Sequence, residues 1–327
     1  MRPALFALAL TFAAAHARPQ DAAATSILSV NVRVVAVDGL VRDRNGELIH
    51  HLTKDDFILT EDGRPQTIRY FTEDENLPLT IGLMVDTSVS QQPYFAEQQL
   101  ASRTFLTNML THPQDNAFVV RFDSNVSLLQ KLTSDRLKLA AALGRLRLAR
   151  VEPLPPRQGP TAGTLLFDAI CGAAYAAFGD EGALRYGRRA LVILTDGEDN
   201  GSTKSLDEAI RCAELGDVTV YTVLYSSRDP GPRAEDDPHV VATPRMHLMG
   251  RTTMERISRS TGGRLLLVSK KQPIEKVFEL IETDLRNQYR IGYTPPASPP
   301  FRYHDIELKP LNKQFKIQSR VGYYTPK

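Results

Sequence analysis

The chain has 327 residues, of which 42% are hydrophobic and 24% are charged, as in a globular protein of one large domain or two modest ones. Its formal net charge of +2 shows no polybasic or acidic character, so we expect no nucleic-acid partner. No apolar run reaches the roughly 20 residues that cross a bilayer, and we expect no transmembrane segment.

The N-terminus has the order of a secretory signal peptide. Arg2 supplies a positive charge, the apolar run ALFALALTFAAA follows, and the sequence AHA at 15–17 gives a small-x-small cleavage pattern. The alternative is a buried N-terminal helix. We predict a signal peptide over 1–17, a flexible spacer over 18–26, and export to the periplasm or the cell exterior.

Residues 27–76 show strand and turn patterns with few helix signals. Alternating valines predict a half-buried strand near the start of this segment: Val30, Val32 and Val34. Asp38-Gly39 has the composition of a turn. The stretch FILTEDGRPQTIRYF reads as two strands around a Glu-Asp-Gly turn, which predicts a β-hairpin.

Apolar strands alternate with amphipathic helices over 77–288. The predicted strands, in chain order, are LTIGLMVD, NAFVVRFD, the strand before TDGEDN in RRALVILTDGEDN, VTVYTVLYS and RLLLVS. The predicted helices are 91–110, 134–148, 164–178, 206–216, 254–263 and 274–288. This order predicts a doubly wound α/β domain, with a mostly parallel sheet and helices on both faces. The insertion 227–250 is rich in Pro, Asp and Gly and predicts a mobile loop.

Strand patterns return at the C-terminal end, over 289–327. The three candidate strands are YRIGYTPP, FRYHDIELKP and FKIQSRVGYYTP. Forty residues of β-structure alone form a poor core, and 27–76 has the same problem. We therefore expect the two segments to pack together as one small β-sandwich into which the α/β domain is inserted.

The two cysteines, Cys171 and Cys212, both fall in predicted helices. Export would place them where disulfides persist. The sequence does not give the Cα separation that a disulfide needs, so one bridge and two buried thiols both stay open.

Short polar side chains gather where the predicted strands end. Asp86, Ser88 and Ser90 close the first strand of the sheet, Thr164 enters a helix, and Asp196 follows a later strand. Ligands of open α/β sheets bind beyond the carboxyl ends of the strands, and hydroxyl and carboxylate oxygens suit Mg²⁺ or Mn²⁺. Singly, each residue also fits an ordinary turn or a helix N-cap.

The same stretches resemble a known family. DTSVS is similar to the D-x-S-x-S motif of von Willebrand factor type A domains, GTLLFDAI resembles the family's threonine loop, and ALVILTDGEDN resembles its LTDG strand. The segments that flank 77–288 look similar to secreted von Willebrand factor A-related proteins of the acidobacterial type.

The resemblance implies a metal-ion-dependent adhesion site. Ser88, Ser90 and Thr164 would give hydroxyl oxygens to the ion, and Asp86 and Asp196 would act through water. The expected partner is a protein that offers an Asp or Glu carboxylate, while the oligomeric state stays open. The expectation is a binding protein and not an enzyme.

Two alternatives stay open. A metal-dependent hydrolase or phosphatase of the aspartyl-nucleophile type needs a second aspartate where Ser88 stands, and the chain has no G-x-S-x-G or G-x-x-x-x-G-K motif. A scaffold whose metal is only structural would show the same sequence pattern.

Overall fold

The computed structural model describes residues 34–73, 77–149, 163–178, 187–225 and 244–325. The predicted signal peptide and spacer, together with Val30 and Val32 of the first predicted strand, lie outside these residues.

A six-stranded sheet forms the centre of the α/β part. In spatial order its strands are β10 (Leu265–Val268), β9 (Thr219–Tyr225), β8 (Arg188–Thr195), β5 (Leu79–Asp86), β6 (Asn116–Phe122) and β7 (Val126–Thr133). Neighbouring strands pair in parallel except β7, which is antiparallel to β6. Every residue of β5 is buried, because helices cover both faces of the sheet.

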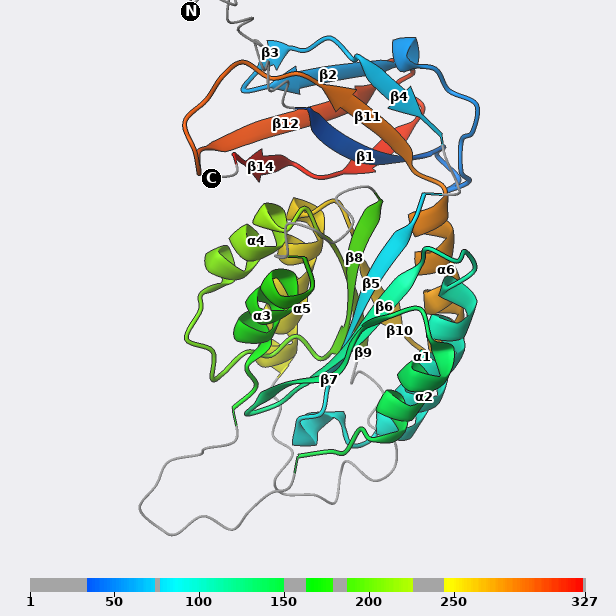
Figure 1. The fold of residues 1–327 in the computed structure, drawn as a ribbon, viewed down its shortest axis with the longest axis vertical. Helices are drawn as coiled ribbons and strands as arrows, with labels where there is room; N and C mark the ends of the chain where they lie inside the picture. Colours follow the sequence, from blue (N-terminus) through cyan, green and yellow to red (C-terminus); the bar gives the residue numbers. More distant parts are fainter. Residues whose placement is uncertain (1–33, 74–76, 150–162, 179–186, 226–243, 326–327) are drawn as a thin grey trace, which may run out of the picture. The chain divides into compact units, whose positions relative to one another are not determined.

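Helices lie on the two faces of this sheet (Figure 1). One face packs against α1 (Phe95–Met109), α2 (Arg136–Gly144) and α6 (Ile274–Arg286). The other packs against α3 (Leu166–Phe178), α4 (Leu206–Leu215) and α5 (Pro244–Ser260). The prediction of a doubly wound α/β fold is confirmed.

Two elements of the α/β part differ from the sequence-based predictions. Strand β7 was not predicted, because it is an edge strand whose apolar residues Val126 and Leu128 are exposed, so it lacks a buried apolar run. Helix α5 begins at Pro244, ten residues before the predicted start at Met254. The predicted mobile loop over 227–250 was therefore wrong for 244–250, and its remaining residues, 227–243, lie outside the described part of the chain. Proline is favoured in the first turn of a helix, where its missing N–H has no intrahelical partner to lose.

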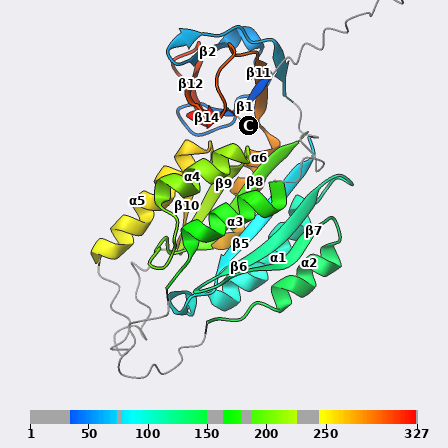
Figure 2. The ribbon, with the colours of Figure 1, turned by 60° about the vertical axis from the view of Figure 1, so that its left-hand side comes forward.

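Two antiparallel four-stranded sheets make up the rest (Figure 2). The first holds β13 (Lys316–Ser319), β1 (Val35–Arg42), β11 (Tyr289–Tyr293) and β4 (Tyr70–Thr72). The second holds β14 (Gly322–Tyr324), β12 (Tyr303–Pro310), β2 (Phe57–Glu61) and β3 (Arg64–Pro65). Strands from both ends of the chain pair directly, β1 with β11 and β2 with β12. Their inward side chains form one shared apolar cluster.

The turns in this β part follow local sequence only in places. Strands β2 and β3 form the predicted hairpin, and Asp62 and Gly63 make its turn with φ of 49° and 74°. The second strand ends already at Pro65, and the end of the predicted stretch forms β4 in the other sheet. Asp38 and Gly39, in contrast, lie inside β1, so the predicted turn there was wrong. Asp38 accepts hydrogen bonds from Arg290 on β11, at 2.8 Å for both nitrogens, and this cross-strand pairing outweighs the turn preference of the dipeptide.

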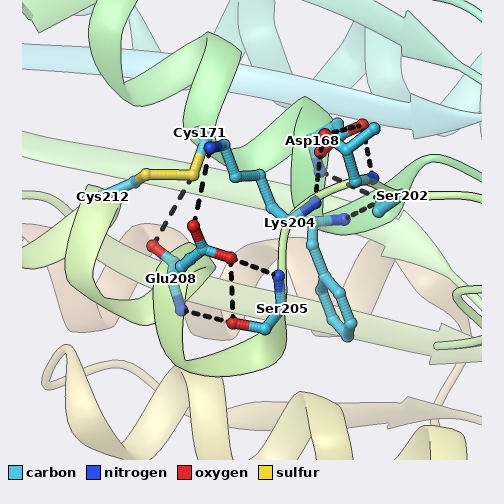
Figure 3. Close-up of a disulfide and its surroundings, with 9 residues drawn as sticks. Asp168, Cys171, Ser202, Lys204, Ser205, Glu208 and Cys212 are labelled. Atoms are coloured by element: carbon cyan, nitrogen blue, oxygen red, sulfur yellow. Dashed lines mark hydrogen bonds and ion pairs between the residues drawn. A yellow bond between two sulfur atoms is a disulfide. The ribbon is translucent and has the colours of Figure 1, made fainter.

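A disulfide joins Cys171 of α3 to Cys212 of α4, with a Cα–Cα distance of 5.1 Å (Figure 3). Close by, Asp168 of α3 accepts hydrogen bonds from the backbone N–H groups of Thr203 and Lys204, both at 2.9 Å. The disulfide holds α3 against α4, and this carboxylate holds α3 against the loop that leads into α4. Of the two possibilities left open by the sequence, the structure has the bridge.

Candidate metal centre

The parallel strands bring three chain segments to one edge of the sheet. Strand β5 ends at Asp86, which pairs with Phe122 at the end of β6, and β8 ends at Thr195 beside it. Asp196 is the next residue along the chain. The segments DTSVS and TDGEDN therefore leave the sheet side by side.

The DTSVS segment turns so that its alternate residues contact one another. The backbone N–H of Ser88 donates to Asp86 Oδ1 at 2.9 Å, and the hydroxyls of Ser88 and Ser90 lie 3.0 Å apart. A 3₁₀ turn over Val89–Gln91 follows directly. Asp86 is fully buried, Ser88 is partly exposed and Ser90 is exposed, so this row of oxygens runs from the interior to the surface.

Thr195 connects the two strands through its side chain. Its hydroxyl donates to Asp86 Oδ2 at 2.7 Å and accepts from the Gly197 N–H at 3.0 Å. Gly197 has a φ of 83°, and a Cβ there would lie 2.7 Å from the carbonyl oxygen of Gly250. The glycine is therefore needed for the turn in which Asp196 lies.

The electrostatics of this edge favour a cation. Burial, and secondarily the negative charge of Asp196, raise the pKa of the Asp86 carboxyl above its usual range. Hydrogen bonds from Ser88 and Thr195 offset only part of that effect. Two carboxylates with hydroxyl oxygens beside them are the donor set of a hard divalent cation, so these residues fit Mg²⁺ or Mn²⁺.

Thr164 lies on a third loop that is tied to the other two. Its N–H donates to Asn200 Oδ1 at 2.5 Å, and the Asn200 N–H donates to the Thr164 carbonyl at 3.2 Å. The next residue, Leu165, donates its N–H to the carbonyl of Asp123 at 2.9 Å. The Asp123 carboxylate in turn accepts from the Thr87 hydroxyl at 2.8 Å, within DTSVS. Thr164 is thus bonded directly to Asn200 of TDGEDN, and it is linked to DTSVS through Leu165 and Asp123.

The sequence analysis missed four residues that hold this arrangement: Thr87, Asp123, Thr195 and Asn200. Three of them were within reach of the sequence, because Thr87 belongs to the quoted stretch DTSVS, and Thr195 and Asn200 belong to LTDGEDN. Asp123 ends the quoted strand NAFVVRFD, but its importance comes from contacts with residues 36 and 42 positions away, Thr87 and Leu165.

No helix among the described residues is long and apolar enough to cross a membrane. No protein-family model matches the sequence, and the search of curated proteins found no match.

Comparison with solved structures found several similar chains. BatB from Bacteroides thetaiotaomicron aligns at 18% identity with a TM-score of 0.46, over 63% of this chain and 96% of that one. Proximal thread matrix protein 1 from the mussel byssus, with a zinc-occupied MIDAS motif, aligns at 14% identity with a TM-score of 0.47, over 69% of this chain and 50% of that one.

A third match is von Willebrand factor type A from Catenulispora acidiphila, at 12% identity and a TM-score of 0.48, over 81% of this chain and 73% of that one. These identities and TM-scores are too low to carry residue roles over to this chain, so the candidate metal centre depends on the geometry of this chain's own residues. Von Willebrand factor type A proteins are among the solved structures to which this chain is similar.

Proposed function

We propose that this protein is an exported binding protein of the von Willebrand factor type A kind, which holds a protein partner through a bound Mg²⁺ or Mn²⁺. The proposed metal site consists of the side chains of Asp86, Ser88, Ser90, Thr164 and Asp196. The three hydroxyls would bind the ion directly, and the two aspartates would act on it through water. The bound cation would supply a Lewis-acidic position for an Asp or Glu carboxylate of the partner. We propose binding and not catalysis as the role of the site.

One observation carries the proposal. Asp86 is completely buried beside the charge of Asp196, and its neighbours supply only part of the compensation that two close carboxylates need. A divalent cation at this point would balance both charges. The hydroxyls of Ser88 and Ser90, which are 3.0 Å apart, are positioned to complete its oxygen shell.

The exposure of the five residues supports a partner on the solvent side. Asp86 and Thr164 are buried, Ser88 and Asp196 are partly exposed, and Ser90 is exposed. A cation held among them would have protein oxygens behind it and solvent in front. Because the two aspartates balance its charge, an incoming carboxylate would not meet a net negative site.

Export and domain organisation belong to the same proposal. The disulfide between Cys171 and Cys212 supports an oxidising compartment, as a signal peptide over 1–17 would provide. The pairing of β1 with β11 and of β2 with β12 supports a sandwich built from 27–76 and 289–327, with 77–288 as the inserted domain.

The test is partner capture with a metal control. The mature protein is immobilised in buffer with about 2 mM Mg²⁺, a concentration at which weak oxygen sites fill. The native envelope fraction is passed over it, and the retained proteins are eluted with chelator. We expect a protein that elutes with chelator, that free acetate or glutamate competes away, and that Asp86→Ala does not retain. Retention of the same partner by wild type and by Asp86→Ala, with and without metal, would contradict the proposal. Hydrolysis of a phosphate ester that depends on Asp86 would favour an enzyme instead.

A further inference from the structure

A second group of metal-ligating side chains lies in the β part of the protein. Glu61, Asp62 and His304 each offer one ligand atom, and these atoms all lie within 4.8 Å of one another. Glu61 is the last residue of β2, Asp62 follows in the tight turn to β3, and His304 lies on β12. Glu61 and His304 are buried, with exposures of 4% and 5%.

The distances suit one small ion. His304 Nδ1 lies 2.9 Å from Asp62 Oδ2 and 3.5 Å from Glu61 Oε1. Two ligand atoms of a tetrahedral zinc, with bonds of about 2.0–2.1 Å, are about 3.3 Å apart. Both distances from Nδ1 are within about half an ångström of that value, and the two carboxylate oxygens lie within 4.8 Å of each other. Small movements of the carboxylates would bring all three atoms to zinc-bonding distance, with Zn²⁺ replacing a proton between imidazole and carboxylate.

The second oxygen of each carboxylate accepts hydrogen bonds from other groups. Glu61 Oε2 accepts from the hydroxyl of Tyr293 and, at 3.3 Å, from that of Tyr323. Asp62 Oδ1 accepts from the backbone N–H of Asp305 at 3.0 Å. These bonds leave Oε1 and Oδ2 directed at the imidazole.

The far nitrogen of the imidazole has a partner as well. His304 Nε2 lies 2.7 Å from the Ser298 hydroxyl, which can accept its proton when Nδ1 binds a metal. The ring also stacks on Tyr323, with centroids 5.4 Å apart. Outer contacts of this kind fix the tautomer and orientation of histidines that ligate metals.

We propose that Glu61, Asp62 and His304 form a zinc site, separate from the centre at the strand ends. Three protein ligands leave one position for water, on the side where the Asp62 side chain is 38% exposed. The nitrogen ligand selects zinc over magnesium, which prefers oxygen alone. The ion would link the β2–β3 turn to β12 and so stabilise the sandwich.

The experiment uses the full mature chain carrying Asp86→Ala, so that the strand-end centre does not contribute. Zn²⁺ is titrated by calorimetry, and Co²⁺ is added separately to read visible absorption as a report of low coordination number. The decisive variant adds Asp62→Asn, which keeps the acceptor for the Asp305 N–H and suits a φ of 49°. The matched control adds Asp305→Asn, the same change on an exposed neighbour of His304.

We expect one Zn²⁺ per chain in the parent and in the Asp305→Asn control, and at least about tenfold weaker binding with Asp62→Asn, or about 1.4 kcal/mol. Intense Co²⁺ bands should appear only in the first two proteins, and excess Mg²⁺ should not displace the zinc. Melting temperatures without metal check that each variant is folded. Absence of zinc binding in the parent, or equal affinity with Asp62→Asn and Asp305→Asn, would mean that the group is only a set of hydrogen-bonded ion pairs.

Discussion

The hydroxyl of Thr195, at the end of β8, donates a 2.7 Å hydrogen bond to the buried Asp86 Oδ2 at the end of β5. This bond fixes one carboxylate oxygen and leaves Oδ1 to the Ser88 N–H at 2.9 Å. Both oxygens of Asp86 therefore have protein donors, in keeping with the proposed role in which Asp86 acts on the cation through water.

Thr195→Val should remove the hydrogen bonds of the Thr195 hydroxyl while keeping the shape of the side chain. It leaves Asp86 Oδ2 and the Gly197 N–H without their present partner, at a cost of about 1–3 kcal/mol in the free energy of unfolding. We also expect weaker Mg²⁺ binding. Urea denaturation and calorimetry measure the two effects. Thr80→Val, at a buried threonine near the start of β5, is the control and should leave Mg²⁺ affinity unchanged.

Gly163→Ala should disturb Thr164 through its backbone. A Cβ at Gly163 would lie 3.0 Å from Gly201 Cα and 3.2 Å from Asn200 Oδ1, the atom that accepts from the Thr164 N–H. The loop must shift, and we expect Mg²⁺ affinity to fall about tenfold.

The matched control is Gly172→Ala in α3, where a Cβ would meet no atom within 4 Å. It should raise the free energy of unfolding by about 0.5–1 kcal/mol and leave metal binding alone. If both alanines weaken Mg²⁺ binding equally, Thr164 is not specifically placed by this loop contact.

The disulfide should stabilise the fold by restricting the unfolded chain. Cys171 and Cys212 are 41 residues apart, and the loop-entropy estimate for that separation is about 4 kcal/mol. Wild type in dithiothreitol, and the double variant Cys171→Ala/Cys212→Ala, should unfold at lower urea concentrations than the oxidised protein. Dithiothreitol should have no effect on the double variant. An unchanged midpoint on reduction of the wild type would show that the bridge contributes nothing to stability.

Glu214 on α4 should make stability depend on pH near neutrality. Burial raises the pKa of its carboxyl to about 7, and the charge of Arg320 offsets only part of the effect. The folded state then holds a proton that the unfolded state releases from about pH 4.5 upward. The free energy of unfolding should therefore fall as pH rises from about 4.5 to 7, by at most about 3 kcal/mol, and then level off.

Glu214→Gln should remove this contribution, because the amide does not ionise. The variant should be more stable than wild type at pH 8 and should differ little from it at pH 5. Urea denaturation at both values measures the difference. The control is Glu255→Gln, the same change at an exposed glutamate of α5. A Glu214→Gln variant that follows the wild-type pH profile would disprove this assignment.

The helices and strands of the fold could be predicted from the sequence where the hydrophobic pattern was strong. Strand β5 is buried throughout and largely apolar because both of its faces are covered, and α4 begins with the capping box of Ser205 and Glu208. Strand β7 and the first turns of α5 escaped prediction, since an exposed edge strand and a proline-led helix carry turn-like or weakly patterned sequence. FKIQSRVGYYTP was read as one strand, yet it forms β13 and β14 in different sheets, a division set by tertiary pairing.

For the candidate centre, the sequence supplied the proposed ligands but not all of the residues that hold them in place. Asp86, Ser88 and Ser90 stand out because their spacing is local. Asp123 joins Thr87 to the loop of Thr164 only after β6 has paired with β5, and nothing local distinguishes it from any aspartate in a turn. The group of Glu61, Asp62 and His304 was missed for the same reason, because about 240 residues separate the histidine from the carboxylates.

Binding of a divalent cation at Asp86 is measured by melting the wild type and Asp86→Ala with Mg²⁺, Mn²⁺ and chelator, followed by calorimetric titration of both. Mg²⁺ should raise the wild-type melting temperature by mass action and leave Asp86→Ala unchanged. Without metal, the stability of Asp86→Ala should differ little from that of wild type, because removal of a buried carboxyl from beside Asp196 offsets the lost hydrogen bonds from Thr195 and Ser88. An equal response of both proteins to Mg²⁺ would contradict the account, since the oxygens of DTSVS would then form only a turn.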